Sequence, residues 1–425
     1  MKVLWLVSIT IPAAAAACGL KAREIGGGWL TGALEAVRTA PNPPQLMICS
    51  VDNRVSEPKT AEADGITYAI LPDGSTEGFR ALLDRLSPDL VHIWGTEYAA
   101  ARAMQQAAED LPVLIGIQGV MTDCANHLND GVPERYLHSG ALWRAIDRVV
   151  PGGLLDVNQA RFDALAASER EVLQNARFVT GRTSFDREAV RQMAPNAVYF
   201  SCNETLRPEF YLPPCWSPRT FGQSPVLLLS QGNYPLKNLH TVLRAMPTLL
   251  KQWPGLTLRV DGWPPLDKGP LLRPVIRRMF PYQSWCAQLI RKLGLDGHVE
   301  YTGPLDAIAM RQAYLDADLF ILPSYSENSP NSLGEAMLLG LPCIASRAGG
   351  IPDMMTDGAE GLIYGEPGDA DALASAVSQI LSLPDQGAAL GKAARARAAV
   401  THDAVRNAAA LIEIYRTIVN GEETP

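Results

Sequence analysis

Short apolar runs and amphipathic stretches alternate along the first half of the chain. Several runs rich in β-branched and aromatic residues are bounded by turn residues, which predicts buried strands at KVLWLVS, QLMICSV, ITYAIL, LVHIW, VLIGIQG, ARFVTG and AVYFS. Apolar residues at helical spacing predict helices at about 29–38, 77–86, 97–108, 157–174 and 184–193. Strands separated by helices of this length predict a parallel sheet that is covered on both faces.

The alternation stops at residues 202–224 and then restarts. This stretch contains Pro208, Pro213, Pro214 and Pro218, a composition typical of a linker between domains. Beyond it, strand patterns recur at VLLLS, LTLRVDG, HVEYTG, ADLFILPS and PCIAS. They alternate with helical patterns at 238–251, 283–293, 306–315 and 369–382.

These patterns predict an α/β protein of two doubly wound, Rossmann-like domains that face a ligand cleft at the carboxyl ends of their strands. The first domain is expected at residues 1–210 and the second at 220–402. An amphipathic helix at 403–419 follows, and we expect the segment 403–425 to pack back on the first domain.

Composition narrows the class of protein. The chain has 425 residues, of which 47% are hydrophobic and 19% charged, as in ordinary soluble proteins. The net charge of −8 argues against nucleic acid as a partner. The seven cysteines form no CxxC pair, which favours free thiols in a reducing, cytoplasmic compartment. No stretch approaches the ~20 apolar residues of a membrane span.

The N-terminus allows two interpretations. The stretch MKVLWLVSITIPAAAAACGL is either a first buried strand that runs into a loop, or the leader of an exported lipoprotein anchored through Cys18. A leader needs a basic start and an unbroken apolar core, whereas this stretch has one lysine and is interrupted by Pro12. The strand is therefore favoured.

The segment 268–292 is basic and aromatic. It contains no acidic residue, and its basic and aromatic side chains are Lys268, Arg273, Arg277, Arg278, Arg291, Lys292, Phe280, Tyr282 and Trp285. One interpretation is a solvated surface excursion whose aromatic residues pack on the domain. The other is a peripheral contact with the inner membrane face or with an anionic lipid-linked acceptor. We favour the first.

The stretch SENSPNSLGEAMLLGLPC, after the strand ADLFILPS, holds two glutamates around a predicted helix start. Ser329 suits the N-cap and Pro330 the first helical position, while Gly340 suits the helix end. Glu327 precedes the helix and Glu335 lies about two turns further on. Free N–H groups between them favour an anion. Carboxylates at both ends would repel an anion and bind hydroxyls instead. A ligand with a diphosphate in the middle and a hydroxyl-rich ring at each end fits this arrangement, as in a nucleotide sugar.

Residues 326–377 resemble the donor-binding segment of family 4 retaining glycosyltransferases (glycosyl transferases group 1), which have the GT-B fold. The similarity consists of the two glutamates eight positions apart, EAM with GLPCIAS, a Gly-Gly pair and DGAEGLIY, in that order. Weaker similarity covers LSQGNYPLKNLHTVLRAM, VEYTGPL, PDLVHIWGTE and ARFVTGRTSFDREAV, and so most of the chain.

The resemblance implies roles for individual residues. Glu335 would bind the ribose hydroxyls, and Glu327 the transferred sugar. Backbone N–H groups near Glu327 would assist, at Asn328, Ser329, Asn331 and Ser332. Lys237 would neutralise the diphosphate and stabilise the charge of the leaving group.

Further residues are implied at the edges of the site. The backbone of Gly303 to Leu305 would lie near the base. Of the glycines that follow the first strand, Gly27 and Gly28 would approach the diphosphate and the acceptor. Two positions depart from the family pattern. Asn233 stands where members usually have an arginine, which Arg182 or Arg347 would replace, and Gln118 stands where many have a histidine.

The implied reaction transfers a sugar, with retention, from a UDP- or GDP-sugar to a glycan or lipid-linked acceptor, as in polysaccharide or cell-envelope biosynthesis. No protein nucleophile is needed. The resemblance implies no metal and no other cofactor, and the Asp-Ala-Asp sequences at 316–318 and 369–371 are expected to be element boundaries. Two alternatives stay open: an epimerase or hydrolase on the same fold, and an exported two-lobed solute-binding lipoprotein.

Overall fold

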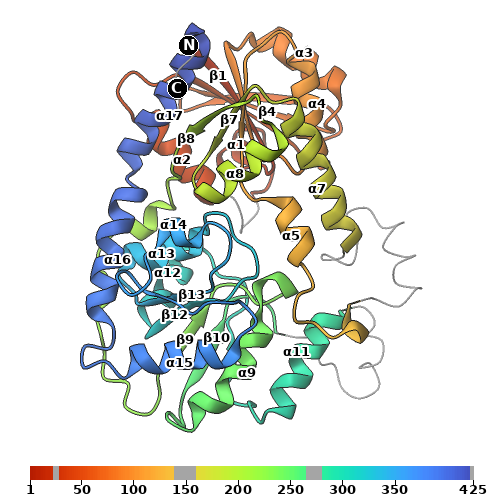
Figure 1. The fold of residues 1–425 in the computed structure, drawn as a ribbon. Coiled ribbons are helices and arrows are strands. Elements are labelled where there is room, and N and C mark those ends of the chain that lie inside the picture. The colour runs from red at the N-terminus through yellow and green to blue at the C-terminus, as the bar shows by residue number, and fades with distance from the viewer. Residues whose placement is uncertain (23–27, 138–158, 265–279, 422–425) are drawn as a thin grey trace. The chain divides into compact units, whose positions relative to one another are not determined.

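The computed structural model describes residues 1–22, 28–137, 159–264 and 280–421. The chain divides into two compact units. Unit 1 comprises Met1–Thr122, Ala164–Pro208 and Val400–Pro425, and unit 2 comprises Asp123–Asp163 and Glu209–Ala399. Each unit is built on one sheet with helices on its faces (Figure 1).

Unit 1 has an eight-stranded sheet in the order β3-β4-β2-β1-β5-β6-β7-β8. Its strands are β1 (Lys2–Val7), β2 (Gln45–Val51), β3 (Lys59–Ala63), β4 (Ile66–Leu71), β5 (Leu90–Trp94), β6 (Val113–Gly116), β7 (Phe178–Gly181) and β8 (Val198–Ser201). All pairs are parallel except β3 with β4 at the edge. The predicted first strand is confirmed: β1 pairs with β2 and β5.

The helices of unit 1 form two layers, because successive side chains of a strand point to opposite faces. Val3, Trp5 and Val7 of β1 pack with α1, α2 and α17, whereas Leu4 and Leu6 pack on the other face with α3, α4, α7 and α8. These helices are α1 (Pro12–Ala17), α2 (Gly28–Arg38), α3 (Thr76–Leu86), α4 (Ala99–Ala107), α7 (Gln159–Gln174), α8 (Ser184–Met193) and α17 (Ala404–Asn420).

Two elements of unit 1 differ from expectation. The alanine-rich stretch after β1 is the short helix α1, with Pro12 in its first turn, rather than a loop, and Cys18 at its end is buried. The edge strand β3 has too few apolar residues to be recognised as a strand. The C-terminal helix α17 packs on unit 1, where Tyr415 Oη accepts a hydrogen bond of 2.9 Å from Trp5 Nε1.

Unit 2 has a six-stranded parallel sheet in the order β11-β10-β9-β12-β13-β14. Its strands are β9 (Val226–Leu229), β10 (Thr257–Val260), β11 (Val299–Tyr301), β12 (Leu319–Leu322), β13 (Cys343–Ala345) and β14 (Leu362–Ile363). In both sheets the strand order reverses beside the first strand, as in doubly wound folds. The predicted fold class is therefore confirmed.

The helices of unit 2 surround that sheet. They are α9 (Leu239–Leu250), α11 (Pro281–Lys292), α12 (Ala307–Leu315), α13 (Asn331–Leu339), α14 (Ile351–Met354), α15 (Ala370–Leu381) and α16 (Ala388–Thr401), with the 3₁₀ turns η2 (Pro208–Tyr211) and η3 (Pro235–Lys237). The sequence patterns did not predict α16, whose apolar residues are mostly alanines.

Residues 123–163 belong to unit 2, although chain order suggested the first domain. This part includes most of α5 (Met121–His127) and the turn η1 (Glu134–Tyr136). Tyr136 lies in the core of unit 2, where its ring stacks on Trp285 at 5.8 Å and its hydroxyl donates to Gln288 at 2.8 Å. These contacts are non-local, so no local pattern could have indicated them.

The aromatic residues of α11 pack inside unit 2. Tyr282 and Trp285 are 6% and 4% exposed and lie in the hydrophobic core. The interpretation of 268–292 as a surface excursion with packed aromatics accounts for these two residues, whereas positions 268–279 lie outside the described residues. Within the described ranges, no helix is long and apolar enough to cross a bilayer.

Candidate functional site

The predicted helix with two glutamates is α13, which follows β12. It begins one residue later than expected: Pro330 is the N-cap, with an extended ψ of 115°, and Asn331 is the first helical residue. Ser329 therefore does not cap the helix, because the chain at Pro330 has not yet turned into it. The helix ends at Gly340, whose φ of +82° is the left-handed conformation expected there.

Helix α13 is buried around its whole circumference from Leu333 to Leu339. Glu335 lies in its middle and is 3% exposed. A carboxylate is kept at such a depth only where polar groups or a ligand compensate its lost hydration. Asn328 is also buried, and Ser329, Asn331 and Ser332 are partly buried, with the Ser332 carbonyl accepting from Tyr314 Oη at 3.0 Å.

Lys237 and Glu327 form an ion pair beside the start of α13. Lys237 Nζ lies 2.5 Å from Glu327 Oε1, and the side chains are 16% and 10% exposed. Burial alone disfavours the ammonium, but the Glu327 carboxylate and the Tyr234 hydroxyl more than offset this and raise the pKa of Lys237 above its ordinary value. Lys237 is thus a firmly charged cation at the carboxyl end of β9.

Backbone contacts hold this pair in place. The loop after β12 is tied to the loop after β9 by the Tyr325 N–H, which donates to the Leu236 carbonyl at 2.9 Å. Asn238, at a φ of 57°, donates from Nδ2 to the carbonyls of Pro323 (2.9 Å) and Pro367 (2.6 Å). The Gly350 N–H donates to the Glu327 carbonyl at 3.0 Å. The two side chains therefore lie on a rigid frame at the ends of adjacent strands.

The structure adds Asp123 and Ser326, which sequence reasoning missed. The Ser326 hydroxyl donates to Asp123 Oδ2 at 2.5 Å and lies 3.6 Å from Cys124 Sγ. His127 donates from Nδ1 to Asp130 at 2.7 Å, and its Nε2 lies 3.6 Å from Asp123 Oδ1. Asp123 therefore fixes the residue that precedes Glu327. Asp123 and Ser326 are 203 positions apart, so only the fold reveals the contact.

The residues predicted near the base lie at the ends of β10 and β11. Gly303, with a φ of +71°, forms an antiparallel bridge to Gly262. The Leu305 N–H donates to Asp261 Oδ1 at 3.2 Å. A Cβ on Gly262 would lie 2.7 Å from Asn233 Nδ2, so the Asn233 amide packs directly on this bridge.

The structure describes one of the two predicted glycines. Gly28 is the first residue of α2 in unit 1, where a Cβ would meet Arg207 Cδ at 2.5 Å. Gly27 lies outside the described residues. Unit 2 therefore brings Lys237 and Glu327 together, beside the helix that carries Glu335.

The two arginines considered as replacements at Asn233 have different surroundings. Arg182, in unit 1, pairs with Glu204 at 3.1 Å, with side chains 7% and 2% exposed, and also donates to the Ile117 carbonyl at 2.9 Å. Arg347, in unit 2, follows β13, is exposed and forms no ion pair within the described part of the chain. It stands three residues before Gly350, whose N–H binds the Glu327 carbonyl. Of the two arginines, Arg347 is therefore the one whose charge is not balanced by an ion pair within the described residues.

The Asp-Ala-Asp sequences are element boundaries, as predicted. Asp369 caps α15 by accepting from the Asp371 and Ala372 N–H groups. Asp316 ends α12, and Asp318 accepts from the Val226 N–H at 2.7 Å and from Arg219 at 2.6 Å. The carboxylates of Asp318 and Asp369 therefore have structural roles.

Comparison with known proteins finds a family and several relatives that are similar in sequence to part of this chain. Residues 217–397 match the family described as Glycosyl transferases group 1. The chain is 29% identical, over 181 residues, to the GDP-mannose-dependent alpha-(1-6)-phosphatidylinositol monomannoside mannosyltransferase of Mycolicibacterium smegmatis (41% of this chain and 43% of that protein). It is 30% identical, over 185 residues, to the D-inositol 3-phosphate glycosyltransferase of Corynebacterium urealyticum (43% and 41%). The chain thus spans less than half the length of these relatives.

Solved structures match over nearly the whole chain. Sucrose-phosphate synthase from Thermosynechococcus elongatus superposes with a TM-score of 0.71 at 17% identity, over 99% of this chain and 100% of that one. The Anabaena protein HepE, in complex with UDP-glucose, gives a TM-score of 0.63 at 16% identity, over 98% and 100%. At such identities the likeness concerns the fold. Residues 217–397 are therefore similar to the glycosyl transferases group 1 family, and the two Rossmann-like domains of the chain have the GT-B fold.

Proposed function

We propose that the protein is a retaining glycosyltransferase that moves a sugar from a UDP- or GDP-sugar to a lipid-linked or polysaccharide acceptor, without a metal. The observation that carries the proposal is the Lys237–Glu327 pair beside the start of α13, a helix in which Glu335 is buried at 3% exposure. A buried cation next to a helix N-terminus suits a diphosphate, and nearby carboxylates suit hydroxyls.

Each group then has one task. Glu335 accepts hydrogen bonds from the ribose hydroxyls, and Glu327 accepts them from the transferred sugar. Backbone N–H groups between Asn328 and Ser332 face the diphosphate. Gly303 and Leu305 lie beside the base.

Lys237 serves the leaving group. As the glycosidic bond breaks, negative charge grows on the diphosphate, and a preorganised ammonium stabilises that charge without reorganisation. Lys237 remains protonated at neutral pH, since its pKa is raised above the ordinary value by Glu327 and Tyr234 in spite of burial. Arg347 supplies the second positive charge, because its guanidinium is exposed and unpaired within the described residues, whereas Arg182 is neutralised by Glu204.

The acceptor hydroxyl attacks from the face that the nucleoside diphosphate leaves, and a diphosphate oxygen takes its proton. This route gives retention and requires no protein nucleophile. The names of the relatives support the donor class: the mycobacterial relative is GDP-mannose-dependent, and the Anabaena protein binds UDP-glucose. We also propose a cytoplasmic location. The seven cysteines are free thiols in the structure, and free thiols are typical of proteins in a reducing compartment.

Titration calorimetry with UDP, GDP, ADP and their glucose or mannose derivatives tests the proposal. The parent should bind one nucleotide series, and Glu335→Ala should weaken that binding about tenfold or more, because the ribose hydroxyls lose a charged acceptor. Glu413→Ala, on the exposed face of α17, is the matched control. Unchanged affinity of Glu335→Ala for every nucleotide would contradict the proposal. Product analysis with added acceptors then separates transfer from epimerisation or hydrolysis.

A further inference from the structure

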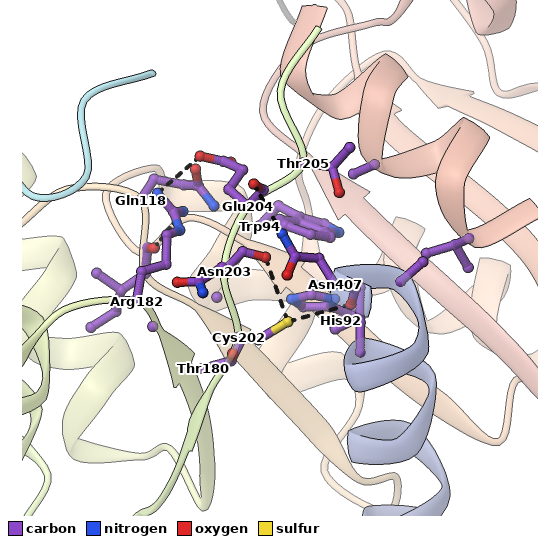
Figure 2. Close-up of a pocket in the computed structure, with 17 residues that line it drawn as sticks. His92, Trp94, Gln118, Thr180, Arg182, Cys202, Asn203, Glu204, Thr205 and Asn407 are labelled. Atoms are coloured by element: carbon purple, nitrogen blue, oxygen red, sulfur yellow. Dashed lines mark hydrogen bonds and ion pairs between the residues drawn. The ribbon is translucent and has the colours of Figure 1, made fainter. Parts of the chain in front are cut away.

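Unit 1 contains a pocket at the carboxyl ends of its central strands. His92 and Trp94 come from β5 and Thr180 from β7, while α2 and α17 supply apolar side chains. Figure 2 shows His92 and Trp94 on one side of the pocket and Arg182 and Gln118 on the other. In doubly wound sheets this end of the strands is where ligands bind.

Three lining side chains carry a buried polar atom that lacks a hydrogen-bond partner among the described residues. These atoms are His92 Nε2, Trp94 Nε1 and Thr180 Oγ1, and the three residues are 0%, 9% and 6% exposed. Buried polar groups are almost always paired, because each unpaired group costs about 1–3 kcal/mol. Three such groups around one pocket point to a polar ligand.

The proton on His92 can be assigned from its neighbours. Trp5 Nε1 donates to Tyr415 Oη at 2.9 Å, and Tyr415 Oη lies 2.7 Å from His92 Nδ1. Because the tyrosine proton then has His92 Nδ1 as its acceptor, the imidazole carries its own proton on Nε2. Burial lowers the pKa of His92 to about 3, so the ring is neutral. His92 Nε2 is therefore a hydrogen-bond donor.

The opposite wall of the pocket determines which charge its ligand can carry. Arg182 and Glu204 form an ion pair of 3.1 Å, so the wall offers both a cation and a carboxylate. A carboxylate beside the pocket disfavours an anion, and the donors on His92 and Trp94 disfavour a cation. A hydroxyl satisfies both walls, because it accepts and donates at once.

The size of the pocket decides how much of the ligand enters. Its volume of about 30 Å³ suits one or two oxygen-sized groups rather than a sugar ring. Gly116 leaves room beside the imidazole, since a Cβ there would lie 2.9 Å from His92 Nε2.

We propose that this pocket binds a hydroxyl-bearing arm of a neutral, polyhydroxylated acceptor, with His92 and Trp94 as hydrogen-bond donors and the Thr180 hydroxyl as a partner that can accept. The assignment rests on the proposed glycosyltransferase function and specifies its acceptor class: a sugar or cyclitol rather than an alcohol with a single hydroxyl. The hydroxyl that enters the pocket anchors the acceptor and is not the one that reacts.

The test uses the full chain with glycerol, D-glucose and myo-inositol as probes, and follows their binding by calorimetry and by tryptophan fluorescence. Thr180→Val keeps the side-chain shape and removes only the hydroxyl, so it should not lower the free energy of unfolding. We expect at least one probe to bind the parent and to bind Thr180→Val roughly threefold to tenfold more weakly, the loss of one hydrogen bond. Thr96→Val is the matched control, because Thr96 is fully buried in unit 1, its hydroxyl has no partner among the described residues, and it does not line the pocket.

Equal binding by Thr180→Val and the parent would overturn the assignment, as would equal weakening by both valine variants. A parent that binds UDP or GDP but none of the three probes would also overturn it and leave the proposed function standing. A parent that binds neither nucleotide nor probe would overturn both.

Discussion

Lys237 Nζ and Glu327 Oε1 lie 2.5 Å apart, although 90 positions of sequence separate the two residues. Both side chains are largely buried. The cation and the carboxylate therefore compensate each other before any ligand binds. In the proposed function, a diphosphate would share Lys237 with Glu327 rather than meet a free ammonium.

Removing the cation alone should destabilise the protein. Lys237→Met leaves the Glu327 carboxylate buried without its partner, and we expect a loss of about 3 kcal/mol in the free energy of unfolding, measured in urea. The double variant Lys237→Met with Glu327→Gln should recover part of this loss, since no charge is then stranded. Arg416→Ala, which breaks an exposed pair with Glu413, should cost less than about 1 kcal/mol. A double variant no more stable than the single one would contradict this account.

Arg347 should matter for the diphosphate and not for the nucleoside. Arg347→Ala is expected to weaken UDP or GDP binding about tenfold, the loss of one charge-assisted hydrogen bond, and to leave binding of the free nucleoside unchanged. Calorimetry with both ligands measures the difference. Arg416→Ala, an exposed arginine of α17, serves as control. If free nucleoside and nucleotide lose affinity equally, Arg347 acts on the fold and not on the diphosphate.

The hydrogen bond between Ser326 and Asp123 should position Glu327, which follows Ser326 in the chain. Ser326→Ala leaves a carboxylate without a hydroxyl donor, and we expect a loss of about 1.5–3 kcal/mol in the free energy of unfolding. Asp123→Asn retains an acceptor oxygen for Ser326 and should cost less. In the proposed reaction, both variants should reduce affinity for the nucleotide sugar more than for the nucleotide alone. The opposite order of the two affinities would show that the contact does not act through Glu327.

Local patterns predicted most of the fold because strands and helices differ in their hydrophobic period. The central strand β1 and helix α2 could be recognised from a few residues each. The patterns missed α1 and α16, where alanines dominate, and the edge strand β3, whose alternation is mild. Such segments owe their structure to packing rather than to amphipathic contrast.

The candidate site was predicted only where its residues are neighbours in sequence. The stretch around α13 carries its own turn, helix and carboxylate signals, so Glu327 and Glu335 could be singled out. The partners of that stretch come from distant segments: Asp123 lies 203 positions from Ser326. Even the helix start was misplaced by one residue, because Ser329 is a good cap by type whereas the backbone turns only after Pro330.

Acid should destabilise the protein through buried histidines. Burial, with a smaller effect of Arg244, lowers the pKa of His240 from 6.5 to about 3, and the ring is packed by Tyr282, Trp285 and Tyr325. Between these two pH values the unfolded chain binds a proton that the folded chain does not. The free energy of unfolding therefore falls as pH drops below 6.5, by up to about 1.4 kcal/mol per pH unit for this residue.

Urea unfolding at pH 4.5, 5.0 and 5.5 measures that slope. His240→Asn should reduce the slope of the unfolding free energy with pH by the amount that corresponds to about one proton. This holds whatever the variant does to stability at pH 7. His92 and His402, whose pKa values burial lowers to about 3 and about 4, contribute in the same direction and remain in the variant. A slope that His240→Asn leaves unchanged would mean that His240 is already protonated in the folded protein over this range.

Gly340 and Gly391 should respond differently to the same added methyl group. Gly340 ends α13 in the left-handed region, at a φ of +82°, and the nearest atom to a Cβ there, the Gly391 carbonyl oxygen, would be 3.6 Å away. Gly340→Ala therefore meets backbone strain but no clash, and should cost about 1 kcal/mol. A Cβ on Gly391 of α16 would lie 2.1 Å from the Gly340 carbonyl oxygen, so one of the two helices must move. We expect Gly391→Ala to cost about 2–3 kcal/mol, as overpacked cores do. Urea unfolding of both variants checks the order. Nucleotide binding by Gly391→Ala should weaken as well, because the clash falls on Gly340, which ends the helix that carries Glu335.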